Sequence, residues 1–252
     1  MPAASKTFAL ATLTASALWF TSAMALDEQQ KKEMGDFIRE YLVENPEIML
    51  EVQSALEAKQ QTQRVALAGQ AVAANHDAIF SSKNDVVLGN PNGDVTVVEF
   101  FDYNCGYCKH ALSDMEEILE SDANIRFVLK EFPILGPNSL AAHKVANAVR
   151  LLAPEKYAEF HRTLLNGTGM ATEESAIQVA SSLGLEEAAL RKSMQDNPND
   201  DIVRDAYRLA NALGVTGTPT YVVGNEALFG AVGKDAIEEK VANVRACGKS
   251  TC

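Results

Sequence analysis

Two cysteines lie where a buried strand meets a helix, and this placement constrains the fold more than any other feature of the chain. Residues 95–101 are almost wholly apolar and predict a buried strand, and residues 125–130 predict another. Apolar residues at helical spacing lie between them. A strand, a helix and a strand in this order form a βαβ unit with a parallel strand pair. Cys105 and Cys108 occupy the first turn of that helix.

The position of Cys105 predicts a reactive thiol. A thiolate at a helix N-terminus faces unpaired backbone N–H groups and the positive end of the helix dipole, so its pKa falls. We therefore expect Cys105 to be the nucleophile. Cys108, one turn further into the helix, is placed to attack a mixed disulfide on Cys105 and release the substrate. Gly106 and Tyr107 between them let the two sulfur atoms meet across a single turn.

The remainder of the body is predicted as a helical segment followed by a hairpin and a last helix. Between residues 140 and 213 the apolar periodicity is wholly helical and indicates five helices. Residues 220–229 predict a β-hairpin, and residues 236–244 a closing helix. The expected body is thus a βαβ unit, a helical insert and a ββα unit.

Residues 86–246 resemble the thioredoxin superfamily, and within it the exported DsbA-like thiol-disulfide oxidoreductases. The resemblance rests on the Cys-Gly-Tyr-Cys sequence and on the sequence Gly-Thr-Pro-Thr at residues 217–220. It implies an α/β fold: a thioredoxin fold with a helical insertion at about 138–213, within a catalytic domain of residues 76–252. It also implies a cis peptide bond at Pro219, packed beside the cysteines, with Thr218 offering its backbone to an incoming peptide.

The same resemblance draws attention to one acid and one base. Glu99 lies six residues before Cys105, where the family often keeps a buried acid. Lys130 lies on the adjacent predicted strand, where a basic partner is often found. Buried together, the two could relay protons during thiol exchange, and the alternative is an ordinary internal ion pair.

The first 25 residues predict a secretory signal peptide. They carry one charge, Lys6, then an apolar run and a small-x-small cleavage pattern at residues 23–25. An uncleaved membrane anchor is the alternative, although the apolar run is shorter than the ~20 residues of a spanning helix. Cleavage implies a periplasmic protein. With 34 acidic and 22 basic residues the chain has a net charge of −12, which argues against nucleic acid as a partner.

Residues 26–75 predict a helical stalk and linker. A helix with one apolar face is indicated, interrupted at Asn45-Pro46, where a second helix begins. We expect residues 58–75 to form a spacer with little to bury. Because two such helices make no independent core, we expect self-association into a homotrimer or homodimer. Packing back onto their own domain is the alternative. The residues of the first apolar face are Met34, Phe37, Ile38, Tyr41 and Leu42.

The cysteines also raise the question of metals. Structural zinc needs four ligands, which the sequence does not bring near Cys105, so we expect no metal and no cofactor. Soft Cu(I) on the thiolates of Cys105 and Cys108 is the alternative from the class of binding proteins. Cys247 and Cys252 follow the last helix, and a local disulfide is the simpler interpretation of this pair; a redox role is the other.

These features together predict a disulfide isomerase or reductase. Gly106-Tyr107 and Thr218 resemble the exported isomerases of the DsbC type, and the motif at residues 101–109 with the helical stalk resembles the ScsC group associated with copper tolerance. The resemblance implies unfolded or misoxidised exported proteins as clients and a DsbD/ScsB-like membrane thiol reductase as partner. A dithiol oxidase of the DsbA type and a Cu(I)-binding periplasmic protein are the alternatives.

Overall fold

The computed structural model describes residues 27–252, which fall into two compact units divided between Leu56 and Glu57. The predicted signal peptide, residues 1–25, lies outside the described residues. No helix within residues 27–252 is long and apolar enough to cross a membrane.

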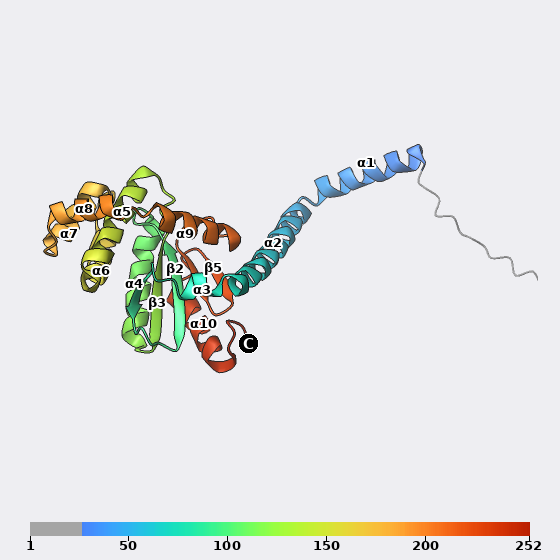
Figure 1. Cartoon of the computed structure of the whole chain (residues 1–252). Coiled ribbons are helices and arrows are strands. Elements are labelled where there is room, and N and C mark those ends of the chain that lie inside the picture. The colour runs from blue at the N-terminus through green and yellow to red at the C-terminus, as the bar shows by residue number, and fades with distance from the viewer. Residues whose placement is uncertain (1–26) are drawn as a thin grey trace, which may run out of the picture. The chain divides into compact units, whose positions relative to one another are not determined.

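The N-terminal unit is helical, as the sequence predicts. It contains α1 (Glu28–Glu44) and the first part of α2 (Glu47–Ala74) (Figure 1). A capping box begins α1: the Asp27 carboxylate accepts a bond of 2.8 Å from the backbone of Gln30, whose side chain accepts one of 3.1 Å in return. No residue of α1 is buried, and Phe37 is 65% exposed. Within this unit the apolar face of α1 is therefore uncovered.

The second unit is built on a five-stranded sheet. Its strand order is β1-β3-β2-β4-β5, in which β2 and β3 are parallel and the other neighbours antiparallel. This confirms the predicted βαβ and ββα units. The strands are β1 (Val86–Gly89), β2 (Val95–Phe101), β3 (Ile125–Glu131), β4 (Thr220–Val223) and β5 (Glu226–Phe229).

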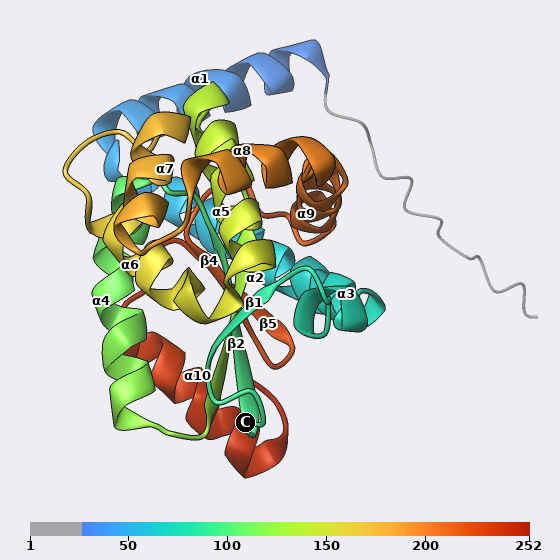
Figure 2. The ribbon, with the colours of Figure 1, turned by 60° about the vertical axis from the view of Figure 1, so that its left-hand side comes forward.

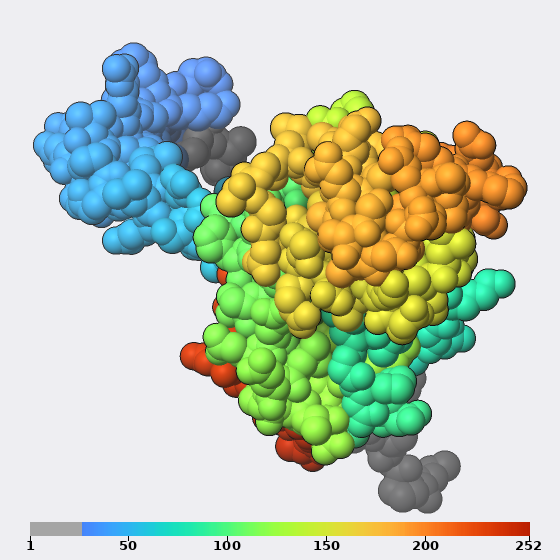
Figure 3. Space-filling model, turned by 90° about the vertical axis from the view of Figure 1, so that its left-hand side faces the viewer, coloured from blue at the N-terminus to red at the C-terminus, as the bar shows by residue number. Residues whose placement is uncertain are grey.

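Helices cover both faces of this sheet (Figure 2). One face packs against α4 (Gly106–Ser121), α10 (Lys234–Cys247) and most of the helical insert, and the other packs against α2, α3 (His76–Phe80) and α9 (Asp200–Ala212). Figure 3 shows the insert, yellow to orange, lying directly on the green α4. The remaining helices of the insert are α5 (Pro137–Leu152), the 3-10 turn Pro154–Lys156, α6 (Tyr157–Asn166), α7 (Glu173–Ser182) and α8 (Glu187–Asp196).

Residues 58–75 bury only two side chains, Ala68 and Val72, as expected, yet the segment is not a free spacer. The second half of α2 belongs to the second unit, and Ala68 and Val72 are buried there beside β-strand residues. Gly69 lies so close to the β4–β5 turn that a Cβ on it would be 3.1 Å from the Asn225 carbonyl oxygen. Arg64 places its guanidinium 3.5 Å from the centre of the Phe229 ring. Small residues thus pack this helix closely without a strong apolar pattern.

The register of the central strands separates Glu99 from Lys130. Glu99 on β2 is aligned with Leu129 on β3, and Lys130 is aligned with Phe100. Because successive side chains of a strand point to opposite faces, Glu99 and Lys130 lie on opposite faces of the sheet. Each is buried, but they are not buried together, so neither a proton relay nor an ion pair forms between them.

Candidate active site

The nucleophile predicted from the sequence lies at the N-terminus of α4. Cys105 is the N-cap residue, and its backbone N–H donates a 3.0 Å bond to the carbonyl oxygen of Asp102. Its side chain is only 7% exposed, whereas Tyr107 is 71% exposed and Gly106 also faces outward. Cys108, one turn into the helix, is buried. Cys105 thus lies just below the surface beside the exposed Gly106 and Tyr107, and the helix turns Cys108 further inward.

The surroundings of Cys105 favour its thiolate. The pKa of Cys105 is lowered to about 5, chiefly by a hydrogen bond from the Cys108 side chain, with smaller contributions from Thr218 and the backbone N–H groups of Cys108 and Tyr107. Together these outweigh burial, which raises the pKa. A thiol with this pKa is ionised at neutral pH, which is the state that attacks a disulfide.

The surroundings of Cys108 have the opposite effect. Its hydrogen bond to the Cys105 sulfur raises the pKa of Cys108 well above its ordinary value, and burial and the carboxyl of Glu99 add to this. Cys108 therefore stays protonated while Cys105 is a thiolate. No disulfide joins the two cysteines in this structure.

A second segment, from the far end of the sequence, completes the site. The Thr218–Pro219 peptide bond is cis, as the resemblance implies, and the Cys105 sulfur lies 3.1 Å from the carbonyl oxygen of Thr218. The β4 strand begins immediately afterwards, at Thr220, and pairs with β2. This pairing holds residues 218–219 beside the cysteine pair. The Thr218 hydroxyl is buried there, without a hydrogen-bond partner among the described residues.

Glu99 lies beneath the cysteine pair, on the face of the sheet that α4 covers. Burial, with smaller contributions from the charges of Cys105 and Asp114, raises the pKa of Glu99 to about 8. Among residues 27–252 it has no ion-pair partner. The carboxyl is therefore mostly protonated at neutral pH and close enough to influence both thiols electrostatically.

Lys130 is not part of this site. Its ammonium forms a buried ion pair with Asp85 and donates a hydrogen bond to the carbonyl oxygen of Ala78. Ala78 lies in α3, and Asp85 lies in the segment that joins α3 to β1. The role that the resemblance implies for Lys130, a proton relay with Glu99, is thus replaced by an ion pair on the other face of the sheet.

Sequence reasoning did not single out Asp102, which is fully buried and holds the loop before Cys105. Its carboxylate accepts hydrogen bonds from the Ser139 hydroxyl (2.7 Å) and from the backbone N–H groups of Asn104 (2.8 Å) and Leu135 (2.9 Å). The loop is thereby bound to the start of the helical insert. An acid inside an otherwise apolar and aromatic run was the signal in the sequence.

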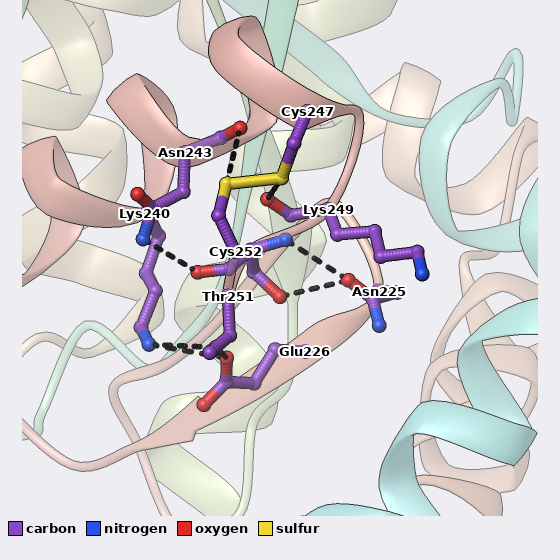
Figure 4. The surroundings of a disulfide bond; sticks show 9 residues. Asn225, Glu226, Lys240, Asn243, Cys247, Lys249, Thr251 and Cys252 are labelled. Carbon is purple, nitrogen blue, oxygen red and sulfur yellow. Dashed lines mark hydrogen bonds and ion pairs between the residues drawn. A yellow bond between two sulfur atoms is a disulfide. The ribbon is translucent and has the colours of Figure 1, made fainter.

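The cysteines at the C-terminus form a separate disulfide, the local bond that we expected (Figure 4). Cys247 ends α10, and its bond to Cys252 folds the tail over the β4–β5 turn. There the Asn225 side-chain oxygen accepts hydrogen bonds of 3.0 Å and 2.9 Å from the backbone N–H and hydroxyl of buried Ser250. These contacts indicate a structural disulfide.

No group of three or more His, Cys, Asp or Glu side chains arranged to hold a metal occurs in the described part of the chain. Cys105 and Cys108 supply two sulfur ligands, the ligand type that a soft ion such as Cu(I) prefers.

Fold and site define a thioredoxin-fold protein with a redox cysteine pair at a helix N-terminus and a cis-proline beside it. The chain belongs to the family of DsbA-like thioredoxin domains, whose family model matches residues 96–242. A second model, the N-terminal domain of the copper resistance protein ScsC, matches residues 30–63.

Solved structures agree with this assignment. A thioredoxin-like oxidoreductase from Silicibacter pomeroyi is 38% identical, with a TM-score of 0.66, covering 69% of this chain and 99% of that one. Proteus mirabilis ScsC in a transitional conformation is 29% identical, with a TM-score of 0.64, covering 88% and 98%. Among curated relatives, the Na⁺/H⁺ antiporter NhaA 1 of Salinispora arenicola is 27% identical over 157 residues. That match covers 62% of this chain but 24% of the antiporter, so the chain spans about a quarter of that relative.

Proposed function

We propose that this protein is a thiol-disulfide oxidoreductase that reduces or isomerises disulfides of exported proteins. The proposal rests on one observation: the pKa of Cys105 is lowered, whereas the pKa of Cys108 is raised. It gives one thiolate ready to attack and one thiol that stays protonated until it is needed.

The proposed reaction balances as two exchanges. The Cys105 thiolate attacks one sulfur of a client disulfide, forming a mixed disulfide and releasing a client thiolate. Cys108 then loses its proton and attacks the Cys105 sulfur, which closes the Cys105–Cys108 disulfide and releases the second client thiolate. Two electrons pass to the client. In isomerisation the released client thiolate instead attacks another client disulfide, and the thiolate freed there attacks the client sulfur of the mixed disulfide, so Cys105 leaves as a thiolate with no net electron transfer.

Isomerisation is favoured by the N-terminal unit. It matches the ScsC N-terminal domain and leaves the apolar face of α1 uncovered, which suits assembly into a homotrimer or homodimer. Several catalytic domains around one client raise the effective concentration of thiolates. By sequence the oligomerisation region is residues 26–75. Because residues 57–74 pack in the second unit, a truncation that removes the apolar face and spares the core starts at Glu57.

The proposed location is the periplasm. The support is the signal-peptide pattern of residues 1–25 and the Cys247–Cys252 disulfide, which an oxidising compartment preserves. An isomerase there has to be kept in the dithiol form, so we propose a DsbD/ScsB-like membrane thiol reductase as its electron donor. Misoxidised exported proteins are the proposed clients.

Two other functions are alternatives to this proposal. A dithiol oxidase is favoured by the lowered pKa of Cys105, because a stabilised thiolate makes the corresponding disulfide more oxidising. A Cu(I)-binding protein for copper tolerance would use the sulfurs of Cys105 and Cys108. It would bind Cu(I), lose the metal in the Cys105→Ser variant and reactivate no client.

A trapping experiment tests the proposed reaction. In the Cys108→Ala variant the mixed disulfide on Cys105 cannot be resolved, so incubation with insulin should yield a covalent adduct that dithiothreitol releases. The Cys105→Ser variant is the matched control and should give no adduct. Adduct formation on Cys108 in that control, or none in either variant, would contradict the assigned roles.

A further inference from the structure

The loop between α6 and α7 is held beside the cysteine pair from two sides. We call residues 167–171 the insert loop. On one side, Lys109 of α4 donates hydrogen bonds to the carbonyl oxygens of Gly167 (2.6 Å) and Gly169 (3.3 Å). On the other, Asn104, the residue before the nucleophile, contacts Ala171. The loop is thus attached to the residues directly flanking the Cys-Gly-Tyr-Cys sequence.

Asn104 makes the more specific of these two contacts. Its side-chain amide donates to the Ala171 carbonyl oxygen (2.9 Å), and its side-chain oxygen accepts from the Ala171 N–H (2.8 Å). The same amide also donates to the Ser139 hydroxyl (3.1 Å), which in turn is bonded to Asp102. A carboxamide alone presents a donor and an acceptor at this spacing, so Asp or Ala at this position loses one or both backbone bonds.

The contact between Asn104 and Ala171 determines where Met170 lies. Met170, the neighbour of Ala171, is 62% exposed, so the loop carries an apolar side chain at the surface one residue from the Asn104 contact. The hydrogen bonds of the Asn104 side chain go to Ala171 and Ser139 and not to the Cys105 sulfur. Its contacts therefore act on the loop and not on the thiolate.

We propose that Asn104 is a positioning residue that holds the insert loop, with Met170, in place for a polypeptide client of Cys105. This rests on the proposed function. A loop held in advance costs a client no ordering on binding, so losing the two backbone bonds weakens client binding and leaves the chemistry of Cys105 intact.

The test compares a protein client with a small disulfide, using the full chain. Asn104→Ala should raise KM for insulin reduction about tenfold, the effect of losing two ordinary hydrogen bonds, with kcat changed less than twofold. The rate of reaction with 5,5′-dithiobis(2-nitrobenzoate) and the pH at which Cys105 is half ionised should match the unchanged protein. Asn211→Ala, an exposed asparagine on α9, is the control and should change none of these values.

Two further variants keep the test decisive if Asn104→Ala folds poorly. Lys109→Met loosens the same loop from its other side, and Met170→Ser removes the apolar side chain itself; each should raise KM for insulin several-fold. Unchanged KM values, or a fall in the small-disulfide rate equal to the loss with insulin, would overturn the proposal. If the unchanged protein reduces neither substrate, the proposed function fails instead.

Discussion

Cys105 and Cys108 carry identical side chains, and their surroundings give them opposite tasks. The sulfur of Cys105 faces the helix N-terminus and Thr218, while that of Cys108 faces the protein interior and Glu99. The strongest single contribution to each pKa shift is the other cysteine. The reactivity of the site is therefore a property of the pair.

Removing one partner should change the other. We expect the Cys105 thiolate to be half formed near pH 5 and the Cys108→Ala variant to move this midpoint upward by a pH unit or more, because the largest stabilising bond is lost. Thiolate absorbance at 240 nm against pH measures the midpoint, with Cys105→Ser as the blank. An unchanged midpoint in Cys108→Ala would mean that the helix N-terminus alone lowers the pKa.

Glu99 should make the folded protein less stable as the pH rises. Its pKa in the folded protein is about 8, against 4.5 ordinarily, so between these values the folded state binds the proton that the unfolded state has lost. Stability falls with pH across that window. From pH 5 to pH 8 the unchanged protein should lose about 3 kcal/mol relative to Glu99→Gln, which cannot ionise. Urea unfolding at the two pH values measures this, and parallel pH dependences in both proteins would contradict it.

At the scale of elements, Lys130 attaches α3 and the segment after it to strand β3. Its ion pair with Asp85 is buried, and the same ammonium donates a hydrogen bond to the carbonyl oxygen of Ala78 in α3. Lys130→Met leaves a carboxyl buried without its partner and should lower the free energy of unfolding by about 3 kcal/mol. The 240 nm midpoint of Cys105 should not move, because Lys130 lies on the other face of the sheet. A shifted midpoint with unchanged stability would restore Lys130 to the active site.

The elements that the sequence predicts well are those with strong local patterns. The apolar run of β2, the helical periodicity of α4 and the residues Gly217 to Thr220 each indicate their own structure, and together they locate the cysteine pair and the cis-proline. The register between two strands cannot be predicted from such local patterns. A shift of one residue between β2 and β3 decides whether Glu99 and Lys130 share a face, and each strand's own pattern is the same in either case.

Local sequence patterns also did not predict the contacts between distant segments of the chain. Asn104 bonds to Ala171, 67 residues away, through backbone groups that any residue carries. In the second half of α2, Ala68 and Val72 are buried and Gly69 lies close to the β4–β5 turn, although alanine and glycine give a weak apolar signal in the sequence. Such contacts follow from the assembled fold, which is why the site's supporting residues emerged only with the structure.

At the scale of the whole molecule, the proposed function needs both units. The second unit holds every residue of the proposed chemistry, and the N-terminal unit holds an apolar face with no buried residue on α1. A single catalytic domain can exchange one disulfide, whereas isomerisation requires repeated attack on a client that stays bound. Assembly through residues 27–56 would supply that retention.

Reactivation of scrambled ribonuclease, measured together with light scattering, tests this most directly. The chain from residue 26 to 252 should be an oligomer that reactivates scrambled ribonuclease, and the chain from Glu57 to Cys252 should be a monomer that still reduces insulin but reactivates little. Cys105→Ser in the longer chain should abolish both activities. A monomeric truncated protein that reactivates scrambled ribonuclease as fast as the longer chain would contradict the proposed role of the N-terminal unit.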